Sequence, residues 1–194
     1  MNQFFVLTGG PGSGKTTLIE SLQKCGYSTM AEAGRAIIQD QVAIGGQALP
    51  WVNPLLFAET MLSWDMRSYH VAEQMNGLVF FDRGVVDVLG YLRLMDLQIP
   101  KHIQIAEQKF RYNRLVFIAP PWEEIFENDG ERRQDFAEAI RTYEAVSSTY
   151  VEMGYDLVEL PRSPVEDRVR FILENAKAAH SIQIEHERCS TRKN

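Results

Sequence analysis

The chain has 194 residues, of which 45% are hydrophobic, and this composition suits one globular domain with a sizeable core. The net charge of −6 argues against a general nucleic-acid-binding surface, so nucleic acid is an unfavoured partner. Cys25 and Cys189 lie too far apart for a zinc or disulfide pattern, and Cys25 is expected to be buried. The absence of a signal-peptide pattern or of a membrane-length apolar run favours a cytoplasmic protein without a membrane partner.

The first distinctive segment is a glycine-rich loop between an apolar run and a helical pattern. Residues 9–16, GGPGSGKT, fit G-x-x-x-x-G-K-[ST], with a strand expected over 4–7 and a helix from residue 15. Glycines let the backbone curl around a polyphosphate, and the helix start adds N–H groups and a positive dipole end. The Lys15 ammonium can reach the β- and γ-phosphates, and the Thr16 hydroxyl can bind Mg²⁺. We therefore expect Mg²⁺ and ATP here, with nucleotide contacts from Gly9, Gly10, Pro11, Gly12, Ser13, Gly14, Lys15, Thr16 and Thr17.

Apolar runs and helical patterns alternate along the rest of the chain. Strands are expected over 4–7, 27–32, 77–82, 114–119 and 155–160. Helices are expected over 15–25, 33–44, 54–75, 86–96, 101–112, 134–153 and 164–179. This alternation predicts an α/β fold with parallel strands covered on both faces, and ligands then bind beyond the carboxyl ends of the strands. We expect a domain over 1–179, with a lid near 120–135, and a polar tail over 180–194 that frays.

The second strand is followed by AEAGRAII, which places Glu32 and Arg35 three residues apart at a helix start. Glu32 could face an acceptor hydroxyl as a base or as an orienting group, and Arg35 could bind an acceptor phosphate or carboxylate. The alternative is an exposed ion pair. The segment 49–74 is expected to form one wall of the acceptor pocket.

The third strand ends in LVFFDRG, which puts Asp82 and Arg83 directly after four apolar residues. Asp82 could hold Mg²⁺, directly or through water, or it could take a proton from an attacking hydroxyl. The planar guanidinium of Arg83 suits phosphate oxygens. The alternative is a structural turn with Arg83 in solvent. Whether Asp82 or Glu32 is the general base stays open at this point.

The loop after the fourth strand contains NDGERR, which ends in Arg132 and Arg133. Arginines on a mobile loop suit a lid that closes over the triphosphate and stabilises charge in the transition state. Arg132 is the stronger candidate, and Arg133 is a further candidate for nucleotide binding. The alternative is a charged helix start on the surface.

With these motifs placed, the chain resembles a family of small AAA-type P-loop ATPases that are similar to nucleoside and nucleotide kinases, notably to the ribosylnicotinamide kinase domain. The matches are GGPGSGKTTL, EAGR at 32–35, FFDRG at 80–84 and W…NDGERR at 122–133. The resemblance covers roughly residues 3–175. It implies a P-loop NTPase sandwich with a five-stranded parallel sheet of order 2-3-1-4-5.

The same resemblance implies roles for individual residues. Asp82 would act in phosphoryl transfer, and Arg132 would belong to the lid. In the ribosylnicotinamide kinases a D-G-x-R run after a tryptophan marks the lid, and Asp129, Gly130 and Arg132 match that run here.

These observations favour a kinase that transfers the γ-phosphate of Mg·ATP to a small metabolite such as a nucleoside or nucleotide, because phosphoryl transfer needs mainly positioning and charge stabilisation. A nucleotide-operated ATPase switch that acts on a protein partner is the second hypothesis. A kinase that acts on a macromolecule, such as tRNA or a cell-wall precursor, is the third, and the acidic balance weakens its nucleic-acid version.

Overall fold

A parallel sheet forms the centre of the computed structural model, which describes residues 3–126 and 135–191, with side chains up to residue 181. Within this part of the chain the strands are β1 (Phe4–Gly9), β2 (Ser28–Met30), β3 (Val79–Asp82), β4 (Leu115–Ala119) and β5 (Asp156–Glu159). All four strand pairings are parallel, and the order is β2-β3-β1-β4-β5. The expected α/β fold and its strand order are therefore confirmed.

Helices connect the strands in the order that the sequence predicts. They are α1 (Lys15–Lys24), α2 (Ala33–Ile44), α3 (Pro54–Ala72), α4 (Val85–Leu94), α5 (Lys101–Lys109), the short 3-10 helix η1 (Glu123–Ile125), α6 (Phe136–Glu152) and α7 (Val165–Thr191). The main departure is α7, which was expected to end at residue 179 but continues to Thr191. No glycine or proline interrupts this segment, so nothing in the sequence breaks the helix where fraying was expected.

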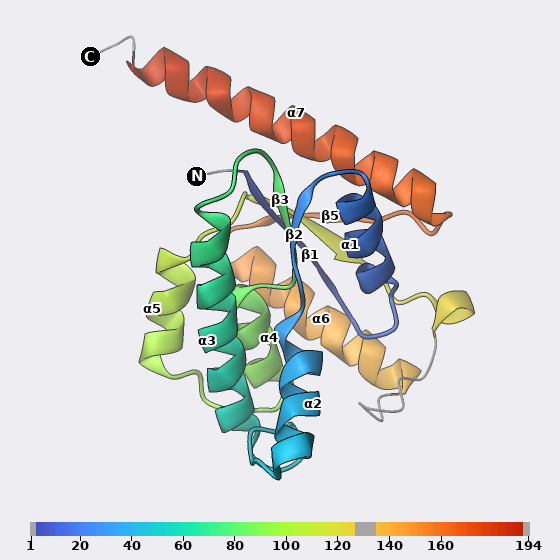
Figure 1. Cartoon of the computed structure of the whole chain (residues 1–194), viewed down its shortest axis with the longest axis vertical. Helices are drawn as coiled ribbons and strands as arrows, with labels where there is room; N and C mark the ends of the chain where they lie inside the picture. The colour runs from blue at the N-terminus through green and yellow to red at the C-terminus, as the bar shows by residue number, and fades with distance from the viewer. Residues whose placement is uncertain (1–2, 127–134, 192–194) are drawn as a thin grey trace.

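Side chains along each strand point alternately to the two faces of the sheet, so apolar strand residues are available to pack against helices on both faces. Phe4 and Val6 pack with buried residues of α3, α4, α5 and α6. Phe5 and Leu7 pack with buried residues of α1 and α7 on the opposite face. Figure 1 shows the resulting three layers, with the strands between the two groups of helices. Both faces of the sheet are thus occupied, which leaves the loops at its carboxyl edge for ligand binding.

Helices α4 and α6 lie unusually close together. A Cβ atom on Gly90 of α4 would lie 3.0 Å from Val146 Cγ2 and 3.2 Å from Val146 Cα of α6. A residue larger than glycine at position 90 would therefore require Val146 to shift by a few tenths of an ångström. This contact fixes the separation of two elements that form a wall of the site described below.

The structure also bears on the expectations for Cys25 and for membrane-spanning helices. Cys25 was expected to be buried, which is wrong: it is exposed at the end of α1, just before the turn at Gly26. The apolar stripe of α1 that faces the sheet ends at Leu22, so Cys25 lies beyond the buried part of the helix. Among the described residues, no helix has both the length and the apolar character that a membrane span requires.

Candidate functional site

The loop between β1 and α1 has backbone conformations that require glycine at two of its key positions. Gly9 has a φ angle of 131°, and a Cβ atom there would lie 2.3 Å from the carbonyl oxygen of Ala119 on the neighbouring strand β4. Gly14, which caps α1, has a φ angle of 78° in the left-handed region. Only glycine adopts both conformations at low cost. The glycine spacing of the motif is therefore a requirement of this loop's shape.

Lys15 holds its ammonium group inside the loop. Its Nζ atom donates hydrogen bonds to the carbonyl oxygens of Gly9 (3.2 Å) and Gly10 (2.6 Å) and to Ser13 Oγ (3.1 Å). Although it is charged, the residue is only 6% exposed. The cation thus lies among the backbone groups that would surround a polyphosphate.

The remaining loop residues surround this lysine. Gly10, Pro11 and Ser13 are buried and Gly12 is exposed, while Thr16 and Thr17 are exposed in the first turn of α1. The first N–H groups of a helix have no acceptors within the helix, so a turn of this kind can direct N–H donors and a positive dipole end to an anion. Arg168 of α7 braces the loop from behind, with its Nη2 donating to the carbonyl oxygen of Ser13 at 3.2 Å.

Asp82 ends β3 directly beside this loop. The strand register pairs it with Leu7 of β1, and its side chain is 4% exposed. One carboxylate oxygen, Oδ1, is buried without a hydrogen-bond partner in the described structure. Burial and the neighbouring charge of Glu32 raise the pKa of Asp82 to about 6, against the opposing effects of Lys15 and Arg83. A buried carboxylate oxygen of this kind suits a hard cation or an ordered water.

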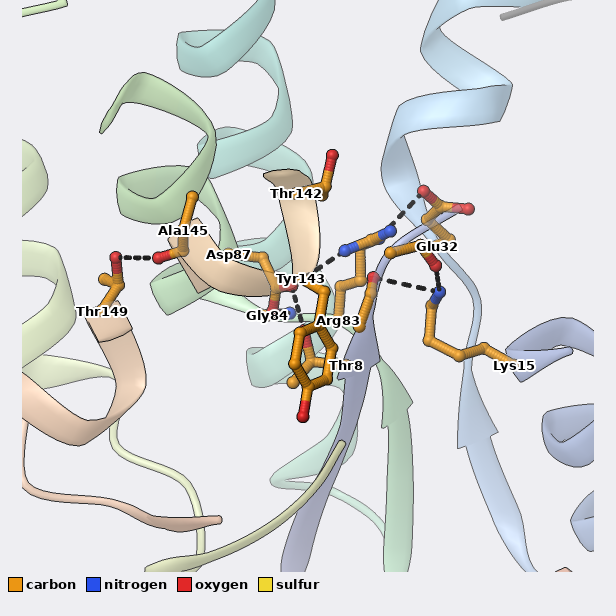
Figure 2. A network of polar contacts seen from close by, with 12 residues as sticks. Thr8, Lys15, Glu32, Arg83, Gly84, Asp87, Thr142, Tyr143, Ala145 and Thr149 are labelled. Atoms are coloured by element: carbon orange, nitrogen blue, oxygen red, sulfur yellow. Dashed lines mark hydrogen bonds and ion pairs between the residues drawn. The ribbon is translucent and has the colours of Figure 1, made fainter. Parts of the chain in front are cut away.

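Arg83 follows Asp82 in the chain, and its side chain extends toward Glu32 and Asp87. Its backbone has a φ angle of 69°, which is uncommon for a residue other than glycine. Its guanidinium donates to Glu32 Oε1 from Nε at 3.2 Å and to Asp87 Oδ1 from Nη1 at 3.1 Å. Figure 2 shows the guanidinium between these two carboxylates. Burial lowers the pKa of Arg83, but Glu32 and Asp87 outweigh it and raise that pKa, so Arg83 is a fixed cation and the solvated alternative is wrong.

Asp87 is a site residue that the sequence analysis missed. Its carboxylate accepts hydrogen bonds from the Thr8 hydroxyl, from Gly84 N (3.0 Å) and from the Tyr150 hydroxyl (2.7 Å), in addition to the Arg83 contact. It therefore links β1, α4 and α6 at one point. A signal was present: Asp87 is the only charged residue in the apolar run VVDVLG, and such a residue in the first turn of a buried helix needs partners.

A cavity of about 340 Å³ opens beside these residues. Pro11 belongs to its lining, so the cavity borders the glycine-rich loop. Its charged lining residues are Glu32, Asp65, Arg83, Asp87 and Glu138, and its aromatic ones are Trp51, Phe57 and Tyr91. As the sequence predicts, the segment 49–74 supplies much of one wall, with Pro50, Trp51, Phe57, Met61 and Asp65.

Asp65 of α3 lies in that wall, although nothing in the sequence marked it as more than a helical acid. It is 9% exposed. Burial raises its pKa well above the usual range, and the charges of Asp87 and Glu32 raise it further, while Arg83 opposes them. A carboxylic acid of this kind can carry a proton and donate a hydrogen bond to a ligand.

The predicted site residues thus separate into three groups. Lys15, Asp82, Glu32 and Arg83 come together at the carboxyl edge of the sheet, between the loop and the cavity. Arg35 is exposed on α2 and is not part of the cavity lining. The lid candidates Arg132 and Arg133, with Asp129 and Gly130, lie outside the described residues.

Solved structures of kinases share this fold. A deoxyadenosine kinase from M. mycoides with products dCMP and a flexible dCDP bound has a TM-score of 0.67 and 12% identity, over 90% of this chain and 99% of that chain. A thymidylate kinase from Ehrlichia chaffeensis has a TM-score of 0.60 and 12% identity, over 90% of this chain and 97% of that one. The M. mycoides enzyme with bound dATP has a TM-score of 0.54 and 13% identity, over 90% and 99% of the two chains.

Sequence comparison gives the family. No curated protein matches the chain. A family model described as an AAA domain matches residues 4–168, which include the glycine-rich loop, Glu32 and the Asp82–Arg83 pair. The chain therefore belongs to this family of P-loop AAA domains.

Proposed function

We propose that the protein is an ATP-dependent phosphotransferase that phosphorylates a hydroxyl group of a small acceptor of the nucleoside or nucleotide class. The observation that carries the proposal is the cavity beside the P-loop, which has Glu32 and Arg83 in its lining and Lys15 and Asp82 next to it. A protein that only binds or hydrolyses ATP needs the loop but has no use for an acceptor-sized cavity at its edge.

In the proposed reaction, an acceptor hydroxyl oxygen attacks the γ-phosphorus of ATP. The bond between the γ-phosphorus and the oxygen that bridges it to the β-phosphorus breaks, and ADP leaves. The hydroxyl proton passes to the Glu32 carboxylate. Glu32 suits this role because it caps the start of α2 at the cavity, with a side chain that is 15% exposed.

Arg83 positions this base. Its Nε atom donates to Glu32 Oε1 at 3.2 Å, and its Nη1 atom is held by Asp87. The Glu32 carboxylate is thereby oriented toward the cavity side of the sheet edge. Asp82, which is next to Lys15 and away from the cavity lining, is assigned to the phosphate side of the reaction instead.

The residues present also fit Mg²⁺. Asp82 offers a buried oxygen that no described residue bonds, and Thr16 offers an exposed hydroxyl at the start of α1. No cluster of three or more His, Cys, Asp or Glu residues suited to a metal occurs in the described part of the chain, so the other ligands would be phosphate oxygens and water. When bound, Mg²⁺ supplies charge neutralisation for the β- and γ-phosphates.

The test is phosphate transfer from radiolabelled Mg·ATP to a panel of nucleosides, nucleotides and a metabolite extract. We expect ADP release that depends on the acceptor, together with a new labelled product. ATP hydrolysis at a rate that no acceptor changes would contradict the proposal and favour a nucleotide-operated switch.

A further inference from the structure

The charged groups in the cavity lining are mostly acidic. Glu32, Asp65, Asp87 and Glu138 contribute carboxyl groups, and Arg83 is the single cation among the described residues that line it. The guanidinium of Arg83 already bonds to Glu32 and Asp87. Asp65 can carry a proton, but the carboxyl groups of Glu32, Asp87 and Glu138 alone outnumber the one guanidinium, so the described lining is more acidic than basic.

A phosphate group on the acceptor would meet this charge unfavourably. Its two negative charges would need a cationic partner, and Arg83 could serve only by leaving carboxylates that are themselves largely buried. Separating a buried ion pair in this way is costly, because each charge left behind loses its compensation. An uncharged hydroxyl has no such conflict, since it can donate to the Glu32 carboxylate while the Arg83 contacts stay in place.

The rest of the lining is suited to a planar apolar group. Trp51, Phe57 and Tyr91 contribute aromatic rings, and Phe57 and Tyr91 lie edge to face with centroids 5.4 Å apart. The Tyr91 hydroxyl is buried without a hydrogen-bond partner in the described structure, so a polar atom is available beside these rings. A volume of about 340 Å³ is at the small end of ligand sites.

We propose that the acceptor enters this cavity without a phosphate group, as a hydroxyl-bearing molecule of nucleoside size with a planar ring. This inference rests on the proposed phosphotransferase function and selects nucleosides over nucleotides as its acceptors. Its basis is the acidic lining, in which Arg83 is the one arginine that the described residues contribute and is bonded to two carboxylates, together with the aromatic wall.

The experiment measures binding, so that it does not depend on turnover. The protein is saturated with Mg²⁺ and the non-hydrolysable analogue AMP-PNP, which occupies the P-loop. It is then titrated calorimetrically with adenosine, guanosine, cytidine, uridine and thymidine, and with their 5′-monophosphates. We expect at least one nucleoside to bind at least about tenfold more tightly than its monophosphate. The reason is that the phosphate of the monophosphate would lie close to the carboxylates of the cavity, and repulsion between like charges is strong at the intermediate dielectric constant of a protein site.

A matched pair of variants tests whether charge is the cause. Glu138 lines the cavity from α6, whereas Glu144 is exposed on the same helix and is not part of the lining. Glu138→Gln should reduce the preference for the nucleoside by about threefold, because it removes one cavity charge. Glu144→Gln should leave the preference unchanged.

Two results would overturn the inference. Equal or tighter binding of the monophosphates would show that the acidic lining does not select the acceptor, and absence of binding by every nucleoside would exclude this acceptor class. Neither result removes the proposed function, which stands as long as some acceptor, including a nucleotide, takes phosphate from Mg·ATP. Failure of transfer to any acceptor would instead remove the function itself.

Discussion

The P-loop and the cavity beside it are two adjacent regions built in opposite ways. The loop consists of consecutive residues, and the groups that we propose to bind phosphate are mainly backbone N–H donors, which come with the shape of the loop. The cavity is lined by side chains from the loop and from residues in or next to α2, α3, α4 and α6. The placement of its charged groups depends on contacts such as those of Arg83 with Glu32 and Asp87. ATP binding should therefore depend on the glycines that fix the shape of the loop and on Lys15, whereas acceptor choice should depend on the side chains that line the cavity.

The largest expected effect comes from removing the one side-chain charge inside the loop. Lys15→Ala should lower kcat/KM for phosphate transfer by at least about a thousandfold, because it removes the cation nearest to the transferred phosphate. Steady-state kinetics with a coupled ADP assay would measure this. Lys24→Ala, at the exposed end of the same helix, is the control and should behave as wild type. Activity of Lys15→Ala within tenfold of wild type would disprove the assigned role.

The second prediction separates the two regions. Glu32→Gln should lower kcat for transfer by about a hundred- to a thousandfold, because the base is lost, while the affinity for ATP stays unchanged. Calorimetry with AMP-PNP and single-turnover transfer assays would measure the two properties separately. Asp40→Asn, at an exposed position on the same helix, is the control. Normal transfer by the Glu32 variant would leave Asp82 as the remaining candidate for the base.

The third prediction concerns Asp82 in the absence of nucleotide and Mg²⁺. Its pKa is raised to about 6 in the folded protein, mainly by burial, so between about pH 4 and pH 6 the folded state binds its proton more tightly than the unfolded state does. This contribution stabilises the fold below about pH 4 and is lost as the pH rises through 6. The free energy of unfolding of wild type, relative to that of Asp82→Asn, should fall by about 1–3 kcal/mol over this range.

Urea unfolding of both proteins at pH 4, 5, 6 and 7 in EDTA would measure this difference. Parallel pH profiles for the two proteins would contradict the assigned titration of Asp82, because the substitution removes only that group.

The smallest expected effect belongs to Arg35. It is exposed on α2 and does not line the cavity, so Arg35→Ala should change kcat/KM by less than about threefold for any acceptor. Kinetics with the preferred acceptor would measure this. A larger loss would mean that the acceptor extends beyond the cavity onto the α2 surface.

The contrast between the two regions also explains what the sequence could predict. The loop was readable because its requirements are local: a strand, glycines at fixed spacing, and one lysine at a helix start. The alternation of elements predicted parallel strands covered on both faces, and the strand order came from the resemblance to P-loop kinases. The helix bounds were predicted closely, except at α7, where the polar composition suggested fraying but no residue stops the helix.

The cavity could be predicted only in part. Glu32 and Arg83 were found because each follows a strand, and such positions meet at the carboxyl edge. Their contact with each other spans 51 residues of sequence, so no local pattern revealed it. Asp65 and Asp87 lie inside helices, where spacing alone does not distinguish a cavity residue from a surface acid. Only the folded arrangement places these four side chains around one space.

The hydrogen bond from Arg168 to Ser13 connects α7 directly to the glycine-rich loop. Arg168 lies in the first turn of a helix of 27 residues, which is about 40 Å long. In Figure 1 this helix runs along the top of the molecule, and its far end lies beyond the rest of the fold in this view. Because Val169, Ile172 and Ala176 pack this helix against the sheet, a displacement of Ser13 would reach α7 at its attached end, and a fluorescent label at the exposed Ser181 would test whether it travels along the helix.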